Sequence, residues 1–89
     1  MVKVRNMKSS SGRSVANQFE IETDDATYLQ SYNSIIAKRM DSGVTYLDEY
    51  YWDYSVTTGR YRNMFLGENK GVTQMKIDSG EYILTNLNN

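Results

Sequence analysis

The chain has 89 residues and a formal net charge of −1, and it contains neither cysteine nor histidine. The absence of cysteine excludes disulfides, thiolate metal sites and a thiol nucleophile, and the absence of histidine excludes a Ser-His-Asp arrangement and the commonest zinc ligand. A chain of this length predicts a single domain, residues 1–89, that is stabilised by one compact core.

The N-terminal part of the chain predicts two β-strands. Residues 2–5 alternate between valine and a basic side chain, which indicates a short first strand, and the SSSG sequence at 9–12 marks a loop. Residues 18–23 alternate again: Phe19 and Ile21 point one way, and the glutamine and the glutamates point the other. This pattern is typical of a half-buried strand.

Three further strands follow in the prediction. Residues 26–32 are rich in β-favouring side chains, and a tight turn at 33–34 leads into 35–40. The serine of that turn could alternatively cap one helical turn, but the β-branched isoleucines that follow it favour a strand. The DSG sequence at 41–43 predicts a hairpin turn into a strand over 44–51.

The periodicity becomes helical after residue 54. Ser55 is a suitable N-cap, and Tyr61, Met64 and Phe65 have the i, i+3, i+4 spacing of one helical face. Gly67 stands where a helix usually ends in a left-handed residue. These signals predict a helix between Ser55 and Gly67.

A second short helix and a final strand are predicted for the C-terminal part. Asn69 is a suitable cap for a helix through Asp78, which Gly80 ends. Residues 81–87 alternate as a last strand. The predicted fold class is therefore α+β: a small antiparallel β-sheet, arranged as a meander, with two short helices packed on one face.

The sequence contains no motif of a familiar catalytic or metal site. There is no Walker A sequence, no dinucleotide-binding glycine motif and no GxSxG elbow. The acidic residues do not have the spacing of a calcium loop, and no apolar run approaches the ~20 residues of a membrane span. We therefore expect a cytoplasmic protein that is not an enzyme, binds no cofactor or metal and has no membrane partner.

Rings and charges concentrate in one segment, DEYYWDYSVTTGRYRN at 48–63. The candidate partner-binding residues are Asp48, Glu49, Tyr50, Tyr51, Trp52, Asp53, Tyr54, Arg60 and Arg62. In an extended strand, Tyr50, Trp52 and Tyr54 share one side. This corner holds more rings than a small domain can easily bury, so we expect some of them in the core and one or two exposed as a contact surface.

The sequence also resembles a known protein family. The matching strings are NQF (17–19), YLQSYNSIIAK (28–38), YLDEYYWDYSVTTGRYRNMFLGE (46–68) and SGEYILTNLN (79–88). They resemble small uncharacterised proteins encoded mainly by bacteriophages, including phages of gut bacteria, and by other mobile elements, with a central YLDxxYWDYSxTTxxYRNxFLG motif. Two positions depart from the family pattern, since Leu29 replaces an aromatic residue and Arg60 replaces a lysine.

This resemblance implies no catalytic residues, because the family has no assigned activity. It implies a phage accessory protein in the host cytoplasm, and such proteins often bind one host protein, such as a restriction, CRISPR or abortive-infection component. In this hypothesis the rings supply apolar contact area, and Asp48, Glu49 and Asp53 mimic phosphates. Arg60 and Arg62 orient the complex by pairing with carboxylates.

Two alternative hypotheses remain open. The protein could bind single-stranded nucleic acid, with the rings as a stacking surface and the basic segment 1–16 as a clamp. The acidic residues beside the rings oppose this alternative, because they repel phosphate. The protein could instead assemble with itself through an exposed edge strand at 81–87.

Overall fold

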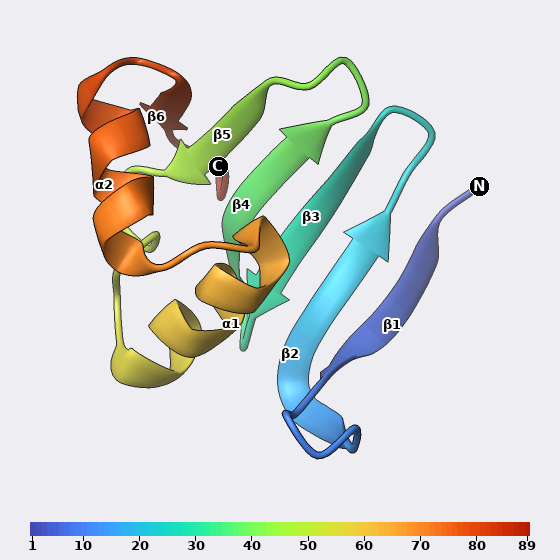
Figure 1. The fold of residues 1–89 in the computed structure, drawn as a ribbon. Helices are drawn as coiled ribbons and strands as arrows, with labels where there is room; N and C mark the ends of the chain where they lie inside the picture. Colours follow the sequence, from blue (N-terminus) through green and yellow to red (C-terminus); the bar gives the residue numbers. More distant parts are fainter.

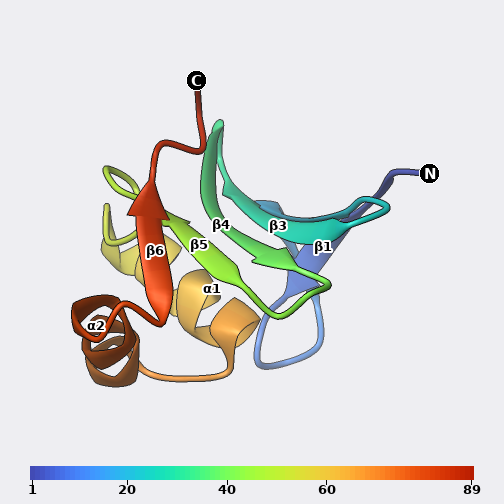
Figure 2. The same cartoon turned by 90° about the horizontal axis from the view of Figure 1, so that it is seen from above.

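The computed structural model describes residues 1–89 as a six-stranded β-sheet with two helices, and both helices lie on the same face of the sheet (Figure 1, Figure 2). In chain order the elements are β1 (Lys3–Lys8), β2 (Ser14–Glu22), β3 (Ala26–Ser31), β4 (Ser34–Met40), β5 (Thr45–Asp48), α1 (Val56–Leu66), α2 (Lys70–Asp78) and β6 (Tyr82–Thr85). The predicted α+β class is confirmed. Neither helix is long and apolar enough to cross a membrane.

The order of the strands in the sheet follows their order in the chain, from β1 to β6. The first five strands form the expected antiparallel meander, whereas β6 pairs with β5 in parallel. A parallel neighbour requires a crossover connection, and α1 and α2 provide it between β5 and β6 (Figure 1). The same connection therefore carries both helices to one face of the sheet.

The strand boundaries agree closely with the predicted ones at 34–40, which forms β4 rather than a helical turn. The strand predicted over 44–51 is wrong in its second half, because β5 ends at Asp48 and residues 49–54 form turns. The carboxylate of Asp48 accepts hydrogen bonds from the backbone N–H groups of the second and third residues after it. A side chain that binds its own following backbone favours a turn over a continued strand.

The core lies between the sheet and α1. Leu29 of β3 and Leu47 of β5 are fully buried, and Tyr61 and Phe65 of α1 pack in the same cluster. Full burial of a leucine side chain contributes about 1.5–3 kcal/mol, so this layer is a main source of stability. The predicted inward face of the first helix is confirmed for its two aromatic residues, whereas Met64 is exposed.

Short polar side chains and a glycine form the helix caps. The Ser55 side chain accepts a hydrogen bond from the Thr58 backbone N–H at 3.1 Å, and the Asn69 side chain accepts one from the Val72 N–H at 2.9 Å. α1 ends at Gly67, whose φ of 70° lies in the left-handed region that favours glycine. These three predicted caps are confirmed.

In β2 the polar side chains face the helices and the apolar side chains face away from them. Gln18 is buried, and its Nε2 donates to the Ser31 hydroxyl at 2.9 Å, which in turn lies 3.0 Å from the Thr58 hydroxyl of α1. Phe19 and Ile21 therefore lie on the opposite face, which no helix covers (Figure 2). In a half-buried strand the apolar side normally faces the core, so the predicted alternation is correct but its orientation is reversed.

Candidate functional site

The carboxylate of Asp48 holds the loop that follows β5. Its Oδ2 accepts hydrogen bonds from the backbone N–H groups of Tyr50 (3.1 Å) and Tyr51 (2.8 Å), and its Oδ1 accepts one from Leu87 (2.8 Å). Burial alone would raise the pKa of Asp48, but these hydrogen bonds outweigh it and lower the pKa overall. Asp48 is only 2% exposed, so it shapes the loop and offers no surface as a phosphate mimic, contrary to the sequence-based hypothesis.

Three tyrosines of this loop contact one another, and we call Tyr50, Tyr51 and Tyr54 the tyrosine cluster. The ring centre of Tyr51 lies 4.8 Å from that of Tyr50 and 5.3 Å from that of Tyr54. Tyr50 is 70% exposed and Tyr54 is 62% exposed, whereas Tyr51 and Trp52 are half-buried and pack against the core. The rings are divided between core and surface as expected, but Tyr50, Trp52 and Tyr54 do not line one side of a strand.

Arg62 joins α1 to the same loop from inside the protein. Its Nη1 donates to the Trp52 carbonyl (2.8 Å) and to Asp53 Oδ1 (3.1 Å), and its Nη2 donates to Asn63 Oδ1 (3.0 Å). The guanidinium also lies 5.3 Å from the centre of the Trp52 ring, within the range of a cation–π attraction. The Arg62 side chain is 2% exposed, so it positions the loop and cannot orient a partner as the sequence suggested.

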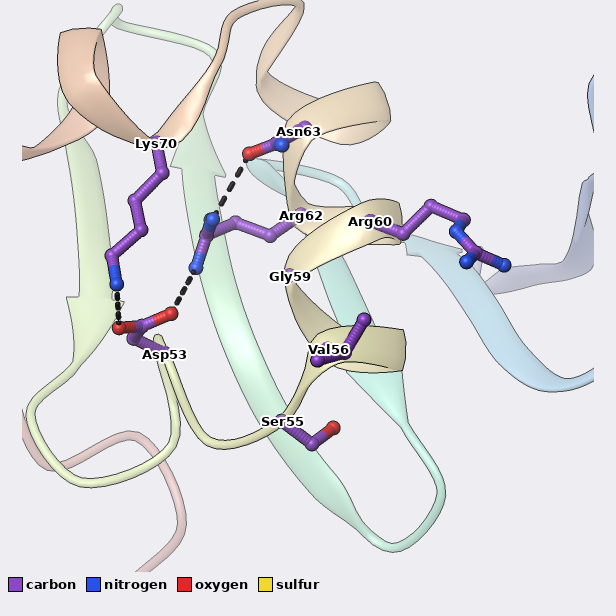
Figure 3. Close-up of a pocket in the computed structure, with 8 residues that line it drawn as sticks. All are labelled: Asp53, Ser55, Val56, Gly59, Arg60, Arg62, Asn63 and Lys70. Carbon is purple, nitrogen blue, oxygen red and sulfur yellow. Dashed lines mark hydrogen bonds and ion pairs between the residues drawn. The ribbon is translucent and has the colours of Figure 1, made fainter.

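Asp53 is the centre of a charged cluster beside α1 (Figure 3). One carboxylate oxygen pairs with Arg62, and the other lies 2.6 Å from Lys70 Nζ. Burial alone would raise the pKa of Asp53, but the hydrogen bonds and positive charges of Lys70 and Arg62 lower it overall. Lys70 is the first residue of α2, so Asp53 links the loop to both helices.

A hollow of about 660 Å³ opens beside this cluster. Its lining residues are Asp53, Ser55, Val56, Gly59, Arg60, Arg62, Asn63 and Lys70 (Figure 3). A Cβ at Gly59 would lie 3.4 Å from Arg62 Nη2, so the helix backbone and the guanidinium are in close contact there. Three basic side chains and one carboxylate line the hollow, and this balance favours an anionic group over a cation.

A second hollow, of about 410 Å³, lies beside Tyr50 and Tyr51. Its other lining residues are Asn33, Ser34, Asp48, Glu49, Asn86, Asn88 and Asn89, and we call this hollow the asparagine groove. Asparagine side chains offer both hydrogen-bond donors and acceptors. The asparagine groove is therefore a polar surface directly beside the exposed rings.

The structure brings some of the candidate contact residues together and separates others. Asp53 and Arg62 form a direct ion pair, whereas Glu49 and Arg60 are exposed. Arg60 extends from α1 on the side away from Asp53 (Figure 3). Lys70 was not among the predicted contact residues, because no local pattern links the first residue of a helix to an aspartate on a distant loop.

The chain can also be placed in a sequence family. A profile of a family of unknown function, DUF8033, matches residues 2–81. The chain belongs to this family. The matched region of this DUF8033 protein includes β1 to β5, both helices and the contact residues predicted from the sequence at 48–62, but not the C-terminal residues of the asparagine groove. No curated protein and no solved structure matches the chain significantly.

Proposed function

We propose that this DUF8033 protein is a non-enzymatic accessory protein that binds a host protein through the tyrosine cluster and the asparagine groove. The observation that carries the proposal is the exposure of Tyr50 and Tyr54 on a loop that is anchored at both ends. Asp48 fixes the start of this loop and Arg62 fixes its end. Because the loop is ordered before binding, little conformational entropy is lost when a partner docks.

Exposed tyrosines on a fixed loop have the properties of interface hot spots. Tyrosine offers a large amphipathic surface with few rotatable bonds, and it is enriched among the residues that dominate binding energy. Both exposed rings rest against Tyr51, which is itself packed against the core. A partner can therefore cover Tyr50 and Tyr54 without rearranging the loop.

The asparagine groove adds hydrogen-bonding groups next to these rings. Asn88 is already held by the backbone of Ile35, whereas Asn86 and Asn89 are exposed. Apolar contact area with a polar rim is the usual composition of a protein interface. Glu49 is an exposed carboxylate in this groove, and it would pair with a basic residue of the partner.

The sequence resemblance supports the choice of partner in this proposal. The string at 46–68 resembles proteins of bacteriophages and other mobile elements. Small phage proteins of this kind often bind one host protein, so we take a cytoplasmic host defence factor as the partner and its inhibition as the outcome. Of the three carboxylates that were expected to mimic phosphates, only Glu49 has this role in the proposal. Asp48 is buried, and Asp53 is paired with Arg62 and Lys70.

Affinity capture from a bacterial host lysate, with and without nuclease, tests the proposal. The tagged wild type should recover one stoichiometric protein in both conditions, and the Tyr50→Ala/Tyr54→Ala double variant should lose it. Tyr46→Ala is the matched control, because Tyr46 does not line the asparagine groove and its ring does not contact the tyrosine cluster, so recovery should persist. Capture of no protein, loss of the protein on nuclease treatment, or its retention by the double variant would contradict the proposal.

A further inference from the structure

The face of the sheet that no helix covers carries a continuous row of side chains across all six strands. Successive register partners in this row, which we call the central row, are Val4, Ile21, Tyr28, Lys38, Tyr46 and Ile83. Directly paired residues share one face of a sheet, and successive residues alternate between faces. Both helices lie on one face of the sheet (Figure 2). Leu29 and Leu47 are buried with the residues of α1, so alternation places their neighbours in the central row on the other face.

A shorter row lies beside the central row. Phe19 pairs with Asn6 on one side and with Gln30 on the other, and Gln30 pairs with Ile35. The two rows together hold aliphatic and aromatic side chains, two amides and one lysine, but no carboxylate. A contiguous apolar surface that faces water usually marks an interaction site.

β2 departs in polarity from the rest of the sheet: Leu29, Ile36 and Leu47 of β3, β4 and β5 face the core, whereas β2 turns its apolar side chains to the open face. The side chains of Gln18, Ser31 and Thr58 are buried between the sheet and α1 and are hydrogen-bonded to one another, while Phe19 and Ile21 face away from the helices. An antiparallel sheet with one solvated face normally turns its apolar side chains toward the core. Phe19 and Ile21 are half-buried on this face, and Val4 and Ile83 are exposed. The apolar area that stays in contact with water does not stabilise the isolated fold and is available for another molecule to cover.

We propose that this open face binds single-stranded DNA, with the rings of Phe19, Tyr28 and Tyr46 stacked on bases. Neighbouring strands are ~4.8 Å apart, so Tyr28 on β3 and Tyr46 on β5 stand roughly 10 Å apart. Single-strand binders use rings on neighbouring strands of a sheet as a stacking platform in the same way. Six strands extend over about 24 Å, which is room for about four nucleotides, the lower end of the site sizes of single-strand-binding folds.

The charge of the face favours an anionic strand over a second copy of this chain. Lys38 lies between Tyr28 and Tyr46 in the central row, and its Nζ is 5.4 Å from the centre of the Tyr28 ring. A second copy packed face to face would bury two opposed lysines in an apolar contact, which is unfavourable. A phosphate beside the rings would instead pair with Lys38. Asp48 ends β5 on the same face as Tyr46, but it is buried and its carboxylate is bound by backbone N–H groups, so it presents little charge to a bound strand.

The remaining side chains of the open face favour DNA over RNA. Asn6 and Gln30 each donate one hydrogen bond to a backbone carbonyl, which leaves an amide oxygen of each able to accept a hydrogen bond from a base. Ile21 and Ile83 are aliphatic and offer no partner to a ribose 2′-hydroxyl, the group by which proteins distinguish RNA. Beside these two isoleucines the less polar deoxyribose therefore fits better than ribose.

Fluorescence anisotropy with short labelled oligo-dT and oligo-rU tests the proposal. In low salt the wild type should bind oligo-dT with a Kd in the range of about 10⁻⁴–10⁻⁶ M and should bind oligo-rU more weakly. Tyr28→Ala and Tyr46→Ala should each weaken binding by about tenfold or more, because each removes one base–ring stack. Tyr46→Phe keeps the ring and should retain binding, which separates the loss of stacking from a loss of folding.

The Tyr50→Ala/Tyr54→Ala variant is the matched control and should bind oligo-dT as the wild type does. Because this variant should lose the host protein but keep the DNA, the two proposals can fail independently of each other. Contact with one or two phosphates predicts a shallow salt dependence, with log Kd rising by roughly 0.7–1.4 per log unit of salt. Unchanged binding by Tyr46→Ala, tighter binding of oligo-rU than of oligo-dT, or no binding at about 10⁻⁴ M protein would overturn the proposal. A dimer that Tyr46→Glu dissociates in sedimentation would also overturn it, because a second copy would then occupy the open face.

Discussion

The side-chain amide of Asn88 forms two hydrogen bonds with the backbone of Ile35: Oδ1 accepts from the Ile35 N–H at 2.7 Å, and Nδ2 donates to the Ile35 carbonyl at 2.9 Å. Ile35 lies in β4 ahead of Ala37, where pairing with β5 begins. The amide thus takes the place of a neighbouring strand and satisfies two backbone groups that would otherwise lack a protein partner. The C-terminal segment is tied to β4 in this way.

Replacement of this amide should destabilise the fold. We expect Asn88→Ala to lower the free energy of unfolding by about 1–3 kcal/mol, because two part-buried backbone groups lose their partner. Urea denaturation at neutral pH measures the difference. Asn89→Ala is the matched control: Asn89 is exposed, and its replacement should change stability by less than about 0.5 kcal/mol. Equal effects of the two variants would show that the Ile35 contact does not stabilise the fold.

Stability should decrease in acid because the pKa values of Asp48, Asp53 and Glu68 are all lowered in the folded protein. Burial alone would raise each pKa, but hydrogen bonds and, for Asp53 and Glu68, neighbouring positive charges outweigh it. A carboxylate whose folded pKa lies below its unfolded value of about 4 stabilises the fold above that pH. This contribution is lost as the pH falls through the folded pKa.

We therefore expect the free energy of unfolding to fall between about pH 4 and pH 2, measured by urea denaturation at a series of pH values. Asp48→Asn should already be less stable at neutral pH, since charge-assisted hydrogen bonds contribute about 1.5–3 kcal/mol each. Its further loss of stability in acid should be smaller than that of the wild type. A wild-type curve that is flat down to about pH 2 would contradict this expectation.

Glu68 should be important for the packing of α2 and β6. Its carboxylate accepts hydrogen bonds from Thr73 Oγ1 (2.7 Å), Lys76 Nζ (2.8 Å) and the Tyr82 hydroxyl (3.0 Å), and its side chain is only 7% exposed. We expect Glu68→Gln to lower the free energy of unfolding by about 2 kcal/mol or more, because an amide replaces a charge that three donors surround.

Glu81 provides the matched control for Glu68, because it lies near the same lysine at the surface. Its carboxylate is 3.9 Å from Lys76 Nζ, and its side chain is 63% exposed. Exposed ion pairs of this kind contribute about 0–1 kcal/mol, so Glu81→Gln should have little effect in the same denaturation experiment. A larger loss for Glu81→Gln than for Glu68→Gln would refute the assignment of the buried cluster.

Gly59 and Gly67 should respond to alanine in opposite directions. Glycine inside a helix costs about 1 kcal/mol relative to alanine, and a Cβ at Gly59 would meet Arg62 only at 3.4 Å, an ordinary contact distance. Gly59→Ala should therefore raise the thermal unfolding midpoint. Gly67→Ala should lower it, because φ is 70° there and alanine is strained in that conformation. A destabilised Gly59→Ala variant would show that Arg62 cannot move to accommodate the methyl group.

Short-range signals were sufficient for the helix caps and for one of the turns. Ser55 and Asn69 cap their helices through groups within one turn of the chain, and Gly43 adopts φ of 105° in the turn that the DSG sequence predicts. The contacts of the candidate site depend on longer-range partners. Arg62 and Lys70 lie on different helices yet share the carboxylate of Asp53, and no spacing in the sequence records that arrangement.

The sequence by itself determined the α+β class, the order of the elements and the concentration of rings at 48–54, because these follow from composition and from contacts within a few residues. Only the tertiary structure decided that β6 joins the sheet in parallel, that Asp48 and Arg62 are internal, and that β2 turns its glutamine inward. A buried polar group is stable only where it has a hydrogen-bonding partner. For the Nε2 group of Gln18 the partner is Ser31 of β3, which in turn contacts Thr58 of α1, so the choice of buried face depended on segments that alternation along one strand cannot reveal.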